Sequence, residues 1–113
     1  MKDREDSVFL QDILESIELI DQYIGDYSEY EFSKNLLVFD AIIRRFEIIG
    51  EAAHKTSKEF KSKYPEIEWQ LMKDMRNKIS HEYFGVSSET VYNTIKSDLP
   101  LLKEKIEKLM ESL

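Results

Sequence analysis

The sequence contains no cysteine, only three glycines and two prolines, and no long apolar run. Without cysteine there is no disulfide framework and no thiolate metal site. Two histidines, His54 and His81, are too few for a zinc site, so we expect no metal and no cofactor. A membrane helix needs roughly 20 apolar residues, and the charged residues 1–6 do not resemble a signal peptide. We therefore expect a cytoplasmic protein that makes no contact with a membrane.

Acidic residues outnumber basic residues by 23 to 16, which gives a formal net charge of −7. This balance argues against broad, non-specific binding of nucleic acid, because such binding depends on neutralising many phosphates. It leaves room for a small basic pocket and suits a basic protein partner. A chain of 113 residues forms one domain, here residues 1–113, and a domain of this size often completes its site with a second copy.

Strand-like alternation is scarce, whereas apolar residues recur at three- and four-residue steps along most of the chain. Residues 10–24 carry one such stripe, which predicts a helix that ends near Gly25. Ser28 and Glu31 have the spacing of a capping box, which predicts the start of a short helix. The lysine-rich residues 55–63 predict another short helix that begins near Ser57.

Longer helices are predicted over residues 34–55, 67–84 and 89–113. Pro100 lies inside the last range, so this segment either kinks there or is divided, with Asp98 capping a separate final helix. Together these patterns predict an all-α bundle of four main helices with short additional helices.

The predicted helix over residues 34–55 is apolar around most of its circumference, which is typical of a buried helix. In so short a chain, two buried faces on one helix predict a homodimer as well as a core. The small residues Gly50, Ala52 and Ala53 would allow another helix to approach closely. Arg45 projects into the apolar arc, where a buried arginine needs a partner.

A narrow polar seam runs along the same helix and consists of Asp40, Arg44, Glu47 and Glu51. Two interpretations remain open for it. The seam is either a structural row of ion pairs, or it faces a functional site and holds the groups of that site in position.

The segment from Arg76 to Tyr83 combines a group that binds phosphate with groups that move protons. On an α-helix its polar residues share one arc of about 160°: Arg76, Asn77, Ser80, His81 and Tyr83. Arg76 offers a planar fork of donors suited to a phosphate, and His81 can act as acid or base near neutral pH. Asn77 lies four residues before His81 and can orient the imidazole or a substrate oxygen.

This set of groups suits RNA cleavage. The 2′-hydroxyl of RNA is an internal nucleophile, so a base and cations that stabilise the charge on the phosphate suffice without a metal. Two copies across a dimer would supply an acid and a base together.

Simpler interpretations of these groups are also open. An arginine and a histidine near a helix end often only cap carbonyl groups there. Tyr83 by itself would be a half-buried aromatic residue. The lysines of residues 55–63 are either a solvated face or a contact surface for RNA.

The pattern Arg-x4-His-x-Tyr, formed here by Arg76, His81 and Tyr83, resembles the signature of the HepT-like branch of the HEPN superfamily. The likeness extends over nearly the whole chain, and the blocks that resemble those of the family occur in its order. They are Asp12-Ile13-Leu14, Asp40-Ala41, Arg45-Phe46-Glu47-Ile48-Ile49-Gly50-Glu51-Ala52, Tyr64-Pro65-Glu66-Ile67-Glu68-Trp69, Met75-Arg76-Asn77, His81-Glu82-Tyr83-Phe84 and Asp98-Leu99-Pro100.

The resemblance implies a homodimer of HEPN-type helical bundles whose motifs face each other across the interface. The implied activity is metal-independent RNA cleavage by the toxin of a toxin–antitoxin pair. The implied partner is a small MntA-like nucleotidyltransferase, which would transfer AMP from ATP onto Tyr83. Such a modification would place phosphate charge and bulk beside Arg76 and His81 and block the pocket.

Residue by residue, the resemblance implies catalytic roles for Arg76, His81 and Asn77. Supporting roles are expected for Arg45, Glu51 and Ser80, the last because it shares the arc of Arg76. Two other functions remain open. The chain could be a non-catalytic nucleotide-binding or substrate-binding adaptor for a nucleotidyltransferase, or a purely structural helical dimer.

Overall fold

The computed structural model describes the backbone of residues 2–82 and 87–113 and the side chains of residues 5–77 and 87–113. Every regular element within these residues is an α-helix, which confirms the predicted all-α class. In chain order the helices are α1 (Lys2–Ile24), α2 (Glu29–Ser33), α3 (Leu36–Lys55), α4 (Lys58–Lys63), α5 (Trp69–Glu82) and α6 (Ser88–Ser112). No described helix is long and apolar enough to span a bilayer.

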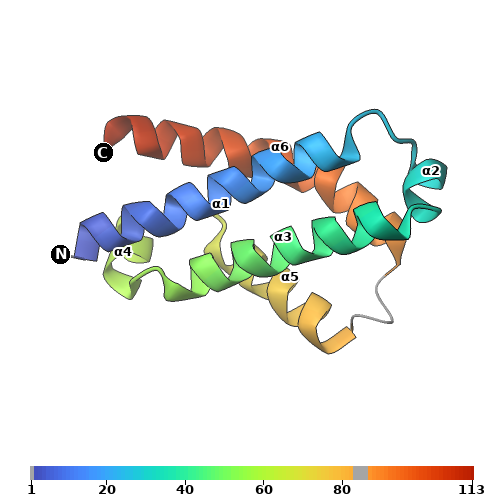
Figure 1. Ribbon diagram of the computed structural model, residues 1–113. Helices are drawn as coiled ribbons and strands as arrows, with labels where there is room; N and C mark the ends of the chain where they lie inside the picture. Colours follow the sequence, from blue (N-terminus) through green and yellow to red (C-terminus); the bar gives the residue numbers. More distant parts are fainter. Residues whose placement is uncertain (1, 83–86) are drawn as a thin grey trace.

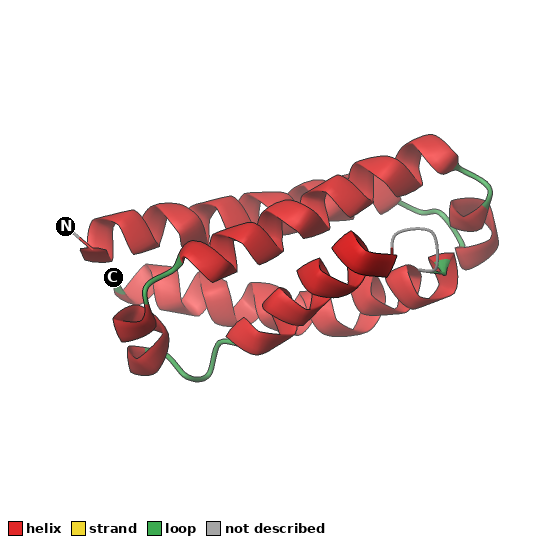
Figure 2. Ribbon diagram, turned by 90° about the horizontal axis from the view of Figure 1, so that it is seen from below, coloured by secondary structure: helices red, strands yellow, loops and turns green. Residues whose placement is uncertain are grey.

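The long helices run roughly lengthwise along the molecule, as Figure 1 shows. Both ends of the chain lie near α4, and α2 lies at the opposite end (Figure 1). Helix α3 packs most extensively against α1 on one side and α5 on the other. Figure 2 shows the same arrangement from below, with all described elements helical. Because α5 packs against α3, the residues of α3 at this contact determine how the side chains of α5 are placed.

The helix ends follow the predicted signals. Gly25 has a φ of 45° just after α1, in the left-handed region that glycine adopts without steric cost. Ser28 and Glu31 form both hydrogen bonds of a capping box at the start of α2. Ser57 caps α4 by accepting a hydrogen bond from the backbone N–H of Phe60. These three predictions are confirmed.

Helix α6 continues through Pro100, so the predicted alternative of a separate final helix capped by Asp98 is wrong. Proline lacks the N–H that would bond to the carbonyl group of Lys96. Pro100 and Lys96 are both exposed, so water can satisfy that carbonyl. Leu99 and Leu102 are fully buried beside the proline and hold the helix against the core.

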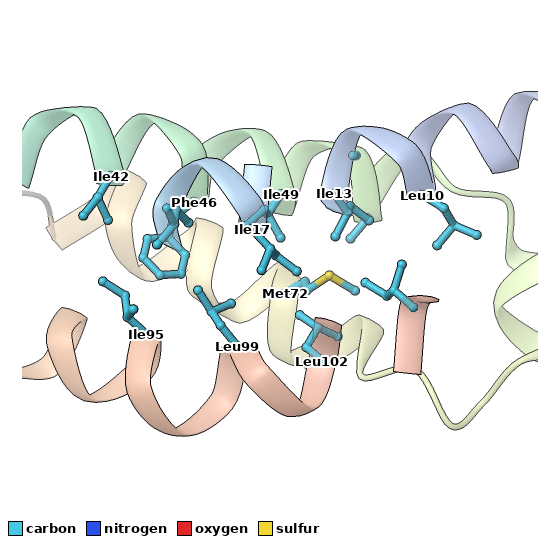
Figure 3. Packing of buried hydrophobic residues seen from close by; sticks show 14 of the residues in the cluster. Leu10, Ile13, Ile17, Ile42, Phe46, Ile49, Met72, Ile95, Leu99 and Leu102 are labelled. Atoms are coloured by element: carbon cyan, nitrogen blue, oxygen red, sulfur yellow. The ribbon is translucent and has the colours of Figure 1, made fainter. Parts of the chain in front are cut away.

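Apolar side chains from the long helices meet in one core (Figure 3). Ile13 and Ile17 of α1 face Leu99 and Leu102 of α6, with Met72 of α5 between them. All five side chains have no exposed surface. Burying such a side chain contributes about 1.5–3 kcal/mol to folding, so this core anchors α5 at Met72, one turn before Arg76.

A buried carboxylate links α1 to the start of α4 at one end of the molecule. Asp6 of α1 is only 2% exposed. It accepts hydrogen bonds from the backbone N–H of Ser57 at 2.8 Å and from the Ser57 hydroxyl at 2.7 Å. The contact fixes the start of α4 against α1, because a buried carboxylate needs such donors.

The outward face of α3 is not covered within the single chain. Leu36 and Leu37 are 71% and 81% exposed, and Ala41, Arg45 and Ile48 are partly exposed. The single chain alone does not cover this face or bury Arg45, so burial nearly all round the helix stays a prediction that requires the second copy. The helix has one face in the core and an apolar face without cover from the described residues of the same chain.

Helices α3 and α5 approach most closely where Gly50 meets Arg76. A Cβ atom built on Gly50 would overlap the Cβ of Arg76 and lie 2.9 Å from its Cγ and 3.1 Å from its Cδ. Gly50 is thus required for packing, since real Cβ atoms do not approach side chains so closely. The prediction of close helix approach at Gly50 is confirmed, and the approaching group is the base of Arg76 itself.

We expect the substitution Gly50→Ala to destabilise the fold by about 1–3 kcal/mol through overpacking. At an open helical position the same change would stabilise by up to about 1 kcal/mol, because alanine is the better helix former. Urea unfolding of the two chains measures the difference. In an Arg76→Gly background, which removes the opposing Cβ, Gly50→Ala should cost nothing. Equal or greater stability of Gly50→Ala in the parent chain would contradict the packing account.

Candidate active site

The side chain of Arg76 runs from the α5 backbone across Gly50 to the surface of α3. There its Nε lies 3.3 Å from Oε2 of Glu51. The Arg76 side chain is 33% exposed and that of Glu51 is 46% exposed. An ion pair this exposed contributes little to stability, about 0–1 kcal/mol. Its effect is to orient the guanidinium group, whose terminal nitrogens form a planar fork of donors of the kind suited to phosphate.

Glu51 is shared by two cations. Besides Arg76, it pairs with Nζ of Lys55 one turn further along α3, at 3.8 Å. One carboxylate therefore holds two positive groups at the same surface. The supporting role expected for Glu51 remains a prediction, but its contact with Arg76 gives that role a geometry.

A pocket of about 400 Å³ lies at this surface, between α1, α3 and α5. Its lining includes both partners of the ion pair, and the full set is Phe9, Asp12, Arg44, Glu47, Ile48, Glu51, Ala52, Lys55 and Arg76. Phe9, Ile48 and Ala52 provide an apolar wall. Three cations and three carboxylates provide the rest of the lining.

The polar seam of α3 faces this pocket through three of its four members. Arg44, Glu47 and Glu51 line the pocket, whereas Asp40 does not. Of the two interpretations of the seam, the one in which it faces a site and holds Arg76 agrees with these contacts. Arg45 is partly exposed and is not among the residues that line the pocket.

The remaining predicted site residues lie further along α5. Asn77 is exposed next to Arg76. Ser80 and His81 belong to the last turn of the helix by their backbone, about 6 and 7.5 Å along the axis from Arg76. Their side chains lie outside the described residues, as does Tyr83 altogether. Residues 83 and 84, the end of the predicted helix, also lie outside them.

Sequence reasoning did not assign Phe9, Asp12 or Lys55 to the pocket. Phe9 and Asp12 are three residues apart on α1, on the side next to its buried stripe. That spacing shows a shared face, but only the pairing of α1 with α3 places this face beside Arg76.

Comparison with known proteins places the chain in a family. Residues 13–109 match the model of the family described as ribonuclease HepT-like. "Probable ribonuclease HepT" of Thermococcus cleftensis is 43% identical over 101 residues, which cover 89% of this chain and 92% of that protein. "Putative RNase MJ0125" of Methanocaldococcus jannaschii is 38% identical over 113 residues, or 100% of this chain and 97% of that protein.

A third relative is longer. "Gamma-glutamylcyclotransferase and putative RNase MJ0434" of the same archaeon is 44% identical over 106 residues, which cover 94% of this chain but only 48% of that protein. No solved structure matches this chain. The family match spans most of the chain, confirms the resemblance drawn from the motif, and shows that the chain belongs to the HepT-like ribonuclease family.

Proposed function

We propose that this chain is an RNA-cleaving toxin that works without a metal ion, with Arg76 and His81 as catalytic residues and Asn77 beside them. The observation that carries the proposal is the placement of Arg76 over Gly50 and against Glu51 at the pocket. A cation fixed at a pocket wall is suited to a phosphodiester. The family supplies the class of substrate, RNA.

The proposed reaction uses the substrate's own nucleophile. His81 removes the proton of the 2′-hydroxyl, whose oxygen attacks the adjacent phosphorus. Arg76 stabilises the extra negative charge that develops on the phosphate oxygens. The bond from phosphorus to the 5′ oxygen then breaks, and an acid returns a proton to that oxygen. The products are a 2′,3′-cyclic phosphate and a 5′-hydroxyl.

A homodimer would supply the acid as a second His81. The exposed apolar face of α3, with Leu37, Ala41 and Ile48, supports such an association. Large exposed side chains of this kind are typical of surfaces that another chain covers. In the dimer, two HEPN-type bundles with four main helices each would place their motifs opposite one another, and Arg45 would be buried at the contact.

The proposed regulator is a MntA-like nucleotidyltransferase that transfers AMP to Tyr83. By sequence, Tyr83 lies two residues after His81 and seven after Arg76. An attached AMP would bring a phosphate charge and a bulky nucleoside to the cation that otherwise binds RNA. Both proteins would act in the cytoplasm, where RNA and ATP are available.

We expect His81→Ala to lower kcat for RNA cleavage by about 10²–10⁴-fold, the usual contribution of an acid or base. Arg76→Ala should lower it by about 10²–10³-fold through lost charge stabilisation. Both variants should also relieve growth inhibition on expression. His54→Ala is the matched control, because His54 is exposed at the end of α3 and lies outside the pocket. Unchanged cleavage and toxicity in both motif variants would reject the catalytic assignment and favour an adaptor or structural role.

Cleavage should continue unchanged in excess EDTA, because the proposed mechanism needs only the imidazole and guanidinium groups. The rate on a defined RNA is measured before and after chelation. A loss of activity that Mg²⁺ or Mn²⁺ restores would reject metal independence while leaving the ribonuclease assignment in place.

Incubation with a MntA-like nucleotidyltransferase and ATP should add AMP to the chain, which intact mass spectrometry detects. Tyr83→Phe should remain unmodified because it lacks the acceptor oxygen. Tyr30→Phe is the control, since Tyr30 is a tyrosine with 63% exposure on α2. Modification of the Tyr83→Phe chain would show that the acceptor is another residue.

A further inference from the structure

Lys73 and Trp69 lie close to Arg76 around the axis of helix α5. At 100° per residue, Lys73 and Trp69 lie within about 60° and 20° of Arg76 around the helix axis. Lys73 is exposed and Trp69 is half-buried, so the helix reaches solvent at these two residues, whereas Met72 between them in sequence is fully buried. Trp69 is about 10 Å from Arg76 along the axis, a span of roughly three stacked nucleotides.

Two lysines of α4 join this side of α5. Burial lowers the pKa of Lys61, nearby Lys73 and Lys58 lower it further, and Asp6 raises it. Lys58 and Lys73 are therefore near enough to Lys61 for their charges to act on its ammonium group. The carboxylate of Asp6 acts in the opposite direction on Lys61, and it is itself buried and bound to Ser57.

A groove of about 600 Å³ lies beside Lys61. Its lining residues include Lys61, Pro65, Trp69 and Leu71. Glu68, the carboxylate in the lining of this groove, forms an ion pair with Lys105 of α6 at 3.1 Å. The negative charge of Glu68 is therefore balanced by Lys105.

The indole ring of Trp69 is fixed in this groove. Its N–H donates to the carbonyl of Tyr64 at 3.0 Å, and the ring packs edge-on against Phe60. Single-strand binding sites commonly combine lysine or arginine side chains with an aromatic ring on which a base can stack, and Lys61 and Trp69 offer both in this groove.

We propose that Lys73, Lys61 and Lys58 bind the backbone of the RNA strand that leaves the catalytic pocket, and that the groove at Trp69 receives one of its bases. This inference rests on the proposed function, which places the scissile phosphate at Arg76. In a chain of net charge −7, a local group of lysines beside an aromatic groove is the expected electrostatic footprint of a strand. We call these four residues the strand track.

The strand track predicts a dependence on substrate length. For an RNA of about ten nucleotides, Lys61→Ala and Lys73→Ala should each raise KM by roughly two- to fivefold and leave kcat unchanged. Each should also reduce the slope of log affinity against log salt by about 0.7. For a dinucleotide, which covers only the scissile bond, both constants should stay unchanged. Lys108→Ala is the control, because Lys108 is an exposed lysine that pairs with Glu104 on α6.

Trp69 supplies a second readout, since it is the one tryptophan of the sequence. A 2′-O-methyl oligouridine of about ten nucleotides cannot be cleaved, and it should quench Trp69 fluorescence in the parent chain. The dinucleotide should not quench it, and Lys61→Ala and Lys73→Ala should weaken the effect of the longer strand.

The outcomes separate the two proposals. If the parent cleaves both RNAs but the lysine variants change neither KM nor quenching, the strand track is wrong and the ribonuclease proposal stands. If the lysine variants slow cleavage of the dinucleotide as much as they slow cleavage of the longer RNA, the lysines act at the catalytic pocket. The strand track is then also wrong. If the parent cleaves neither RNA, the proposed function fails, and the track survives only if the longer strand still quenches Trp69.

Discussion

The contact between α3 and α5 at Gly50 and Arg76 is the constraint on which the account of this chain depends. Because Gly50 has no side chain, the base of Arg76 lies directly on the α3 backbone. From there the side chain of Arg76 runs along the α3 surface, where its Nε meets Glu51. Met72, fully buried one turn earlier, fixes the rotation of α5 that makes this contact possible. A core residue, a missing side chain and a carboxylate thus determine where the guanidinium group of Arg76 lies.

Local signals in the sequence predicted the local structure well. Gly25, the Ser28–Glu31 capping box and Ser57 act on their own backbone within a few residues, so their effects can be read without knowing the fold. The Arg-x4-His-x-Tyr pattern predicted the family, which the comparisons confirm. At Pro100 the local signals left two alternatives, and the structure excludes the separate final helix. The burial of Leu99 and Leu102 is a tertiary effect that outweighs the loss of one backbone hydrogen bond.

The pocket could be predicted only in part. The seam on α3 and the arc on α5 follow from helical periodicity, and both supply residues that line the pocket. Phe9 and Asp12 could not be found this way, since their position depends on how α1 packs against α3. The exposed apolar residues Leu36 and Leu37 of α3 also could not be predicted from helical periodicity. An apolar periodicity predicts that a face is covered, but it does not say whether the same chain or another one covers it.

The most direct test of the proposed chemistry is the identity of the RNA ends that the purified chain produces. Attack by the 2′-hydroxyl, with Arg76 on the phosphate and His81 on the proton, leaves a 2′,3′-cyclic phosphate on one fragment and a 5′-hydroxyl on the other. End-group analysis of the fragments by mass spectrometry distinguishes these ends from those of water attack. The account predicts cyclic phosphate and 5′-hydroxyl ends. Fragments that carry a 5′-phosphate and a free 3′-hydroxyl would contradict it.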